Sequence, residues 1–83
     1  MRYLITCRSL TYAQRSARLL EHSGITAGVS KAPAGLSRNG CSYCLTVSEA
    51  KLKAAAELLR REDMLQGRIY SQDKDGITKE VFL

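Results

Sequence analysis

Alternating apolar and polar side chains predict two regular strands in the first half of the chain. In residues 2–7, one face carries Tyr3, Ile5 and Cys7 and the other carries Arg2, Leu4 and Thr6. Residues 41–47 repeat this period of two, with Tyr43, Leu45 and Val47 on one side. Shorter runs rich in strand-forming residues, at 25–30 and 68–71, predict two further strands.

Helical spacing separates these strands at two places. Thr11 and Gln14 fit a capping-box pattern, apolar residues then recur at helical intervals to Leu20, and Gly24 marks the end. Ser48 is expected to cap a second helix that ends before Gly67. Its apolar stripe consists of Leu52, Ala55, Ala56 and Leu59, and Arg60 and Arg61 suit its negative C-terminal end.

The order strand, helix, strand, strand, helix, strand predicts an α+β fold. Two right-handed crossovers on one sheet give a ferredoxin-like βαββαβ sandwich, with an antiparallel four-stranded sheet in the order 4-1-3-2 and both helices on one face. Asp75-Gly76 separates the fourth strand from the weakly alternating residues 77–82, which predict an extra C-terminal strand. We expect one domain over residues 1–83, with a core at about 2–71 and a C-terminal extension or hairpin at 72–83.

Composition restricts the function classes. A chain of 83 residues supports one small core, and its apolar runs are far shorter than the roughly 18 residues of a membrane-spanning helix. The apolar stretch near the N-terminus is also shorter than that of a secretory signal, so we expect a cytoplasmic protein without a membrane partner. No Ser-His-Asp set, phosphate loop or helical carboxylate pair indicates hydrolase or kinase chemistry, and no cofactor is expected.

Positive charge is concentrated in the first part of the chain. The net charge is +5, and residues 1–48 hold six basic residues against Glu21 alone. Such a face suits an anionic partner, although ordinary solubility explains it equally well. Nucleic acid is disfavoured because Tyr3 and Tyr43 are expected to face the helices rather than present stacking surfaces. The open face of the sheet leaves a homodimer as an alternative.

The three cysteines, Cys7, Cys41 and Cys44, lie in the same basic stretch. Cys7 is expected to be a small buried residue at the end of the first strand, beside the start of the third. Cys41 and Cys44 form a C-x-x-C spacing, which suits a redox dithiol, part of a metal site, or a nucleophile with a resolving thiol. In a regular strand they would point to opposite faces, so they can act together only if the strand proper begins near Tyr43.

Several segments resemble a known family of small bacterial proteins, the selenium/sulfur carrier-like family. The resemblance covers about residues 2–70. It lies in Tyr3-Leu4-Ile5-Thr6, the first helix with Ala13 and Leu20 before Gly24-Ile25, Pro33 to Leu36-Ser37, Gly40-Cys41-x-Tyr43 with Leu45, and Gly67-x-Ile69-Tyr70. The family has a Cys-Gly step where this chain has Cys41-Ser42, and Cys44 is not characteristic of it.

The resemblance implies a carrier protein rather than a stand-alone enzyme, with Cys41 accepting a sulfur or selenium atom and Cys44 as an optional resolving thiol. Its partners would be donor and acceptor proteins of sulfur or selenium metabolism. The supporting residues would be the local cations Arg8, Lys31 and Arg38, together with Gly40 and Tyr43. Two alternatives stay open: a non-catalytic binding or regulatory module, and a thiol redox or metal-binding domain that uses Cys41 and Cys44.

Overall fold

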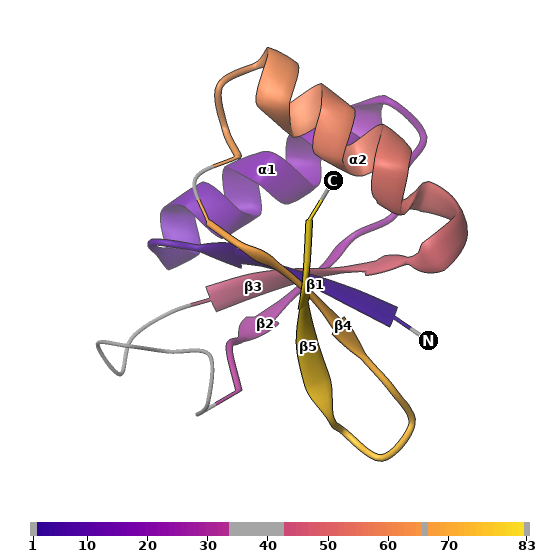
Figure 1. The fold of residues 1–83 in the computed structure, drawn as a ribbon. Helices are drawn as coiled ribbons and strands as arrows, with labels where there is room; N and C mark the ends of the chain where they lie inside the picture. The colour runs from indigo at the N-terminus through magenta and orange to yellow at the C-terminus, as the bar shows by residue number, and fades with distance from the viewer. Residues whose placement is uncertain (1, 34–42, 66, 83) are drawn as a thin grey trace.

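The computed structural model describes residues 2–33, 43–65 and 67–82, which form two helices and five strands (Figure 1). The elements are β1 (Arg2–Cys7), α1 (Leu10–His22), β2 (Gly28–Lys31), β3 (Tyr43–Ser48), α2 (Glu49–Arg61), β4 (Ile69–Gln72) and β5 (Thr78–Val81). The predicted α+β class and the order of the first six elements are therefore confirmed.

The described strands form one antiparallel sheet in the order β2-β3-β1-β4-β5. The first four strands have the predicted neighbours, and the extra C-terminal strand predicted after Asp75-Gly76 is present as β5, which extends the sheet beside β4 to five strands. Asp73 stabilises the turn of this hairpin, because its carboxylate accepts hydrogen bonds from the backbone N–H groups of Asp75 and Ile77, at 2.9 and 3.0 Å. Gly76 supplies the left-handed conformation that the turn needs, at φ 83°.

Both helices cover the same face of the sheet, and the main core lies between the two layers (Figure 1). The odd-numbered positions of β1 and β3 point into it, as their alternation predicts, with Ile5 and Leu45 almost fully buried. Tyr3 and Tyr43 pack against this core, which confirms that they face the helices. The helices contribute the residues that complete the layer: Ala13, Leu20, Leu52, Ala55, Ala56, Leu58 and Leu59.

Helix α1 begins earlier than its capping-box pattern indicates. Ser9 is the N-cap, and its hydroxyl accepts a hydrogen bond from the backbone N–H of Tyr12 at 3.2 Å. Thr11 is an exposed residue within the first turn, so the predicted cap at Thr11 is wrong. At the second helix, Ser48 occupies the expected N-cap position, but its side chain makes no capping hydrogen bond.

The end of α1 explains why β2 is shorter than expected. Gly24 adopts φ 81°, its N–H donates to the carbonyl of Glu21, and the N–H of Ile25 donates to that of Leu20. This is the Schellman pattern, in which an apolar residue after the glycine folds back onto the helix. Ile25 is accordingly buried in the core as part of the helix cap, and the strand begins only at Gly28.

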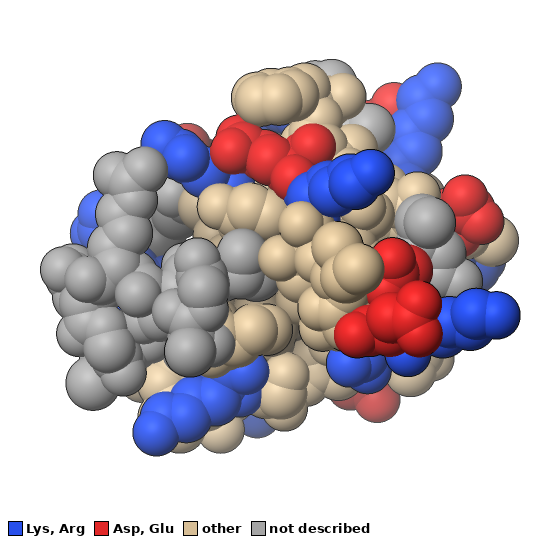
Figure 2. Space-filling view, turned by 60° about the horizontal axis from the view of Figure 1, so that its bottom comes forward, with Lys and Arg blue, Asp and Glu red and all other residues tan. Residues whose placement is uncertain are grey.

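Neither of the two described helices lies over the other face of the sheet (Figure 1). Uncharged side chains occupy its middle and charged side chains lie around its margin (Figure 2). Leu4 and Cys44 are buried without belonging to the core cluster between the helices, as expected for even-numbered positions that point away from it. Neither described helix is long and apolar enough to span a membrane.

Candidate functional site

Several of the predicted site residues lie together at one edge of the sheet, where β1 and β2 end and β3 begins. Strand β1 ends with Cys7, whose partner across the antiparallel ladder is Tyr43, and Tyr43 in turn pairs with Lys31. Arg8 follows Cys7 and is exposed, as is Lys31 at the end of β2. The row Lys31–Tyr43–Cys7, with Arg8 beside it, is called the thiol edge below. Three further predicted residues, Arg38, Gly40 and Cys41, lie outside the described residues.

Cys7 is buried in the core under the helices, as its pattern predicted. Its thiol donates a weak hydrogen bond to the carbonyl oxygen of Ile5, with Sγ and O 3.8 Å apart. Burial, and secondarily the nearby Cys44, raises the pKa of the Cys7 thiol to about 11. A thiol with this pKa is almost entirely protonated at neutral pH, and the thiolate is the nucleophilic form. Cys7 is therefore poorly suited to accept or transfer a group.

Cys44 is buried on the face opposite to Cys7. It lies between Thr6 of β1 and Ser30 of β2, which are its partners across the ladder. Its side chain is almost fully covered, with 1% exposed, and its Sγ shares a hydrogen bond of 3.5 Å with the hydroxyl of Ser30. Any reaction of Cys44 with another thiol thus requires its strand or its surroundings to open.

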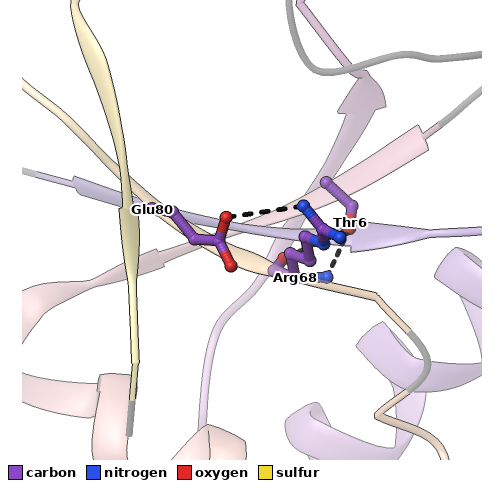
Figure 3. A network of polar contacts seen from close by, with 3 residues as sticks. All are labelled: Thr6, Arg68 and Glu80. Atoms are coloured by element: carbon purple, nitrogen blue, oxygen red, sulfur yellow. Dashed lines mark hydrogen bonds and ion pairs between the residues drawn. The ribbon is translucent and has the colours of Figure 1, made fainter.

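A backbone clamp, absent from the sequence predictions, holds the end of β1. Thr6 and Arg68 exchange three hydrogen bonds: Thr6 N–H to the Arg68 carbonyl at 2.9 Å, Arg68 N–H to the Thr6 hydroxyl at 2.7 Å, and that hydroxyl to the Arg68 carbonyl at 3.2 Å. The guanidinium of Arg68 also lies 3.5 Å from the carboxylate of Glu80 (Figure 3). The clamp joins β1 to the segment before β4, one residue away from Cys7.

Gly67 makes this clamp sterically feasible. A Cβ at position 67 would overlap the carbonyl oxygen and the hydroxyl of Thr6. Gly67 is part of the Gly67-x-Ile69-Tyr70 pattern that carries the resemblance, but the pattern alone names neither Thr6 nor the hydrogen bonds. The only sequence signal was a glycine placed just before a strand, which is typical of close backbone approach.

The family model described as "Putative Se/S carrier protein-like" matches residues 2–71, which is most of the chain. The chain belongs to this family. The matched region of the Se/S carrier-like protein runs from the start of β1 into β4 and contains every residue of the predicted site. Strand β5 lies outside it. No curated protein and no solved structure matches the chain.

The described side chains form no group of three or more His, Cys, Asp or Glu residues that could hold a metal ion. Cys41 lies outside the described residues. The predicted metal alternative at Cys41 and Cys44 therefore stays a prediction.

Proposed function

We propose that this Se/S carrier-like protein accepts a sulfur or selenium atom on Cys41 and hands it to a partner protein. Membership in the family, over a region that includes Cys41, is the observation that carries the proposal. The burial of Cys7 and Cys44 supports it, because both are poorly placed for attack on a partner's chalcogen. Cys41 is the remaining cysteine of the chain and is the residue to which the proposal assigns the reaction.

The thiol edge offers surroundings that suit such a reaction. Cys41 precedes Tyr43 by two residues, and two peptide units span at most about 7 Å, so covalent connection keeps the two residues close. Tyr43 anchors this end of β3 by packing against the core, while Arg8 and Lys31 provide positive charge at the same edge. Positive charge lowers a thiol pKa and increases the thiolate fraction.

The proposed transfer is an exchange at sulfur with no net oxidation. The Cys41 thiolate attacks the outer sulfur of a persulfide on the donor, a new S–S bond forms, and the donor's own S–S bond breaks to release its thiolate. An acceptor thiolate removes the outer atom by the same chemistry. If Cys44 resolves the adduct instead, its thiolate attacks the Cys41 sulfur and releases hydrosulfide, and the resulting disulfide must be reduced by an external thiol.

Intact-protein mass spectrometry tests the proposal. The reduced, metal-free chain is incubated with a cysteine desulfurase and cysteine, or selenocysteine, and compared with Cys41→Ser, Cys44→Ser and Cys7→Ser. We expect a reductant-labile adduct of one chalcogen atom that is lost only in Cys41→Ser. Cys7→Ser serves as the matched control, because it removes a thiol at the same edge that is buried and protonated. Absence of any adduct on the wild-type chain would favour a non-catalytic binding or regulatory module.

A further inference from the structure

The outer face of α1 presents arginines that the fold itself does not use. Ala13, Ser16 and Leu20 are buried, so the opposite side of the helix points away from the sheet. Arg15 and Arg18 are exposed on that side, one helical turn apart, and Arg8 is exposed just before the Ser9 cap. Arg8, Arg15 and Arg18 are together called the arginine face.

No described Asp or Glu side chain forms an ion pair with the arginine face. Within residues 2–33, 43–65 and 67–82, the one ion pair within 4.0 Å joins Arg68 to Glu80. Every Asp and Glu of the sequence lies within these ranges, so no acidic side chain is left outside them. Glu21 is the sole acidic residue of α1, and it lies in the last turn.

Helix α2 shows how the same chain arranges charges for stability. Its first turn carries Glu49 and its last turn carries Arg60 and Arg61, which complements the helix dipole at both ends. Helix α1 has no acidic residue in its first turn, and Arg8 lies beside its positive end. Because this arrangement is unfavourable for the helix alone, it indicates a role for the positive charge outside the fold.

The arginine face reaches the thiol edge through Arg8, which directly follows Cys7 and belongs to both. Helix α1 starts three residues after Cys7 and packs against β2, whose last residue is the exposed Lys31. Leu10, at the start of the helix, is 40% exposed and adds an apolar contact beside Arg8. The cations Arg8 and Lys31 and the apolar side chain of Leu10 therefore lie near the edge where Cys7 and Tyr43 pair.

We infer that the arginine face, with Lys31 and Leu10, docks an acidic surface of the protein that exchanges the chalcogen atom with this chain. The inference rests on the proposed function and adds the chemistry of its partner. A protein fits better than a single-stranded nucleic acid, because Tyr3, Tyr12 and Tyr43 are partly buried against the core and none of them presents a fully exposed ring for stacking. Charge complementarity of this kind accelerates encounter and weakens as salt increases.

The test is a titration of the isotope-labelled full-length chain, followed by amide NMR. The probes are a short oligo-glutamate peptide and a single-stranded RNA of the same net charge. We expect the peptide to shift the amides of residues 8–22 and Lys31, with an affinity that falls as salt is added. Arg15→Glu/Arg18→Glu should weaken peptide binding by about tenfold, because two attractions become repulsions.

Lys51→Glu/Lys53→Glu is the matched control, since it reverses two exposed cations on α2. It should change peptide affinity by less than about twofold. Equal weakening by both double variants, peptide shifts centred on α2, or tighter binding of the RNA would each overturn the inference.

A parallel loading experiment separates this inference from the proposed function. Inorganic polysulfide needs no docking surface, so it should load wild type and Arg15→Glu/Arg18→Glu equally. Failure of polysulfide to load the wild-type chain would refute the carrier proposal, whereas the peptide titration tests the arginine face independently of loading. Circular dichroism of both double variants verifies that α1 and α2 remain folded.

Discussion

Replacing Gly67 by alanine tests whether the backbone clamp positions the end of β1. The new Cβ would overlap both the carbonyl oxygen and the hydroxyl of Thr6, and one of these atoms belongs to the backbone. Rotation of the Thr6 side chain cannot relieve the overlap with the carbonyl oxygen. The two segments must therefore separate, which breaks the hydrogen bonds between Thr6 and Arg68.

The magnitude follows from those contacts. Three hydrogen bonds, each worth about 1 kcal/mol net, give an expected loss of about 3 kcal/mol in the free energy of unfolding. Thr6→Val removes the hydroxyl and its two hydrogen bonds while keeping the backbone contact, so it should cost about 2 kcal/mol. Urea denaturation measures both values, provided that the slope with denaturant stays unchanged.

Gly28→Ala is the matched control for this substitution. A Cβ at position 28 would meet the Thr46 Cβ at 4.0 Å, an ordinary van der Waals contact, and the change should alter stability by less than about 0.5 kcal/mol. If Gly67→Ala were as stable as Gly28→Ala, the close approach of Gly67 to Thr6 would not exist in solution. A loss in Gly67→Ala that also slows chalcogen loading at Cys41 would connect the clamp to the thiol edge.

Three other substitutions or conditions give separate outcomes. At about pH 8, a pKa of about 11 leaves the Cys7 thiolate roughly a hundredfold less populated than an ordinary thiol pKa of 9.0 would, so we expect alkylation of Cys7 only when the chain unfolds. Rapid labelling of Cys7 in the native chain, located by peptide mass spectrometry, would contradict this. Because the pKa of Cys7 is raised in the folded state, its contribution to stability is complete below pH 9.0 and is lost as pH rises towards 11. Urea denaturation should show a fall of about 3 kcal/mol in the free energy of unfolding over this pH range, and Cys7→Ala should lack that fall. Asp63 adopts φ 57° at the end of α2, so Asp63→Gly should raise the free energy of unfolding by up to about 1 kcal/mol, whereas Gly24→Ala, at φ 81°, should lower it by a similar amount; the same sign for both would refute the strain argument.

The strand pattern allowed much of the sheet to be predicted. In β1 and β3, the alternation of side chains fixed which residues face the helices, and antiparallel pairing then placed Cys7 next to the start of β3. The helix ends were harder to predict, because hydrogen bonds rather than periodicity determine them. Ser9 caps α1 without a Glu or Gln three residues later, and Ile25 looks like a strand residue although it completes the helix cap.

The candidate site could be predicted only where it depends on which face of the sheet a strand residue points to. The alternation of side chains predicted Cys7 and Cys44 on opposite faces, and the structure agrees. This alternation does not indicate how deeply either thiol is buried. The clamp was not predictable because it joins residues far apart in the chain, and because a threonine hydroxyl and two backbone groups are too common to mark such a contact in the sequence. The roles of Cys41, Arg38 and Gly40 stay predictions.

Strand β5, which lies outside the family match, makes one margin of the sheet resistant to self-association. If two copies pair through their β5 strands about a two-fold axis, the two strands must run antiparallel. Directly opposite residues then point to the same face of the sheet. The two best-overlapping registers place either Lys79 against Lys79 or Glu80 against Glu80 at the axis. Like charges directly opposite one another destabilise a β-ladder. The charges of β5 therefore disfavour extension of the sheet by pairing with the β5 strand of a second copy.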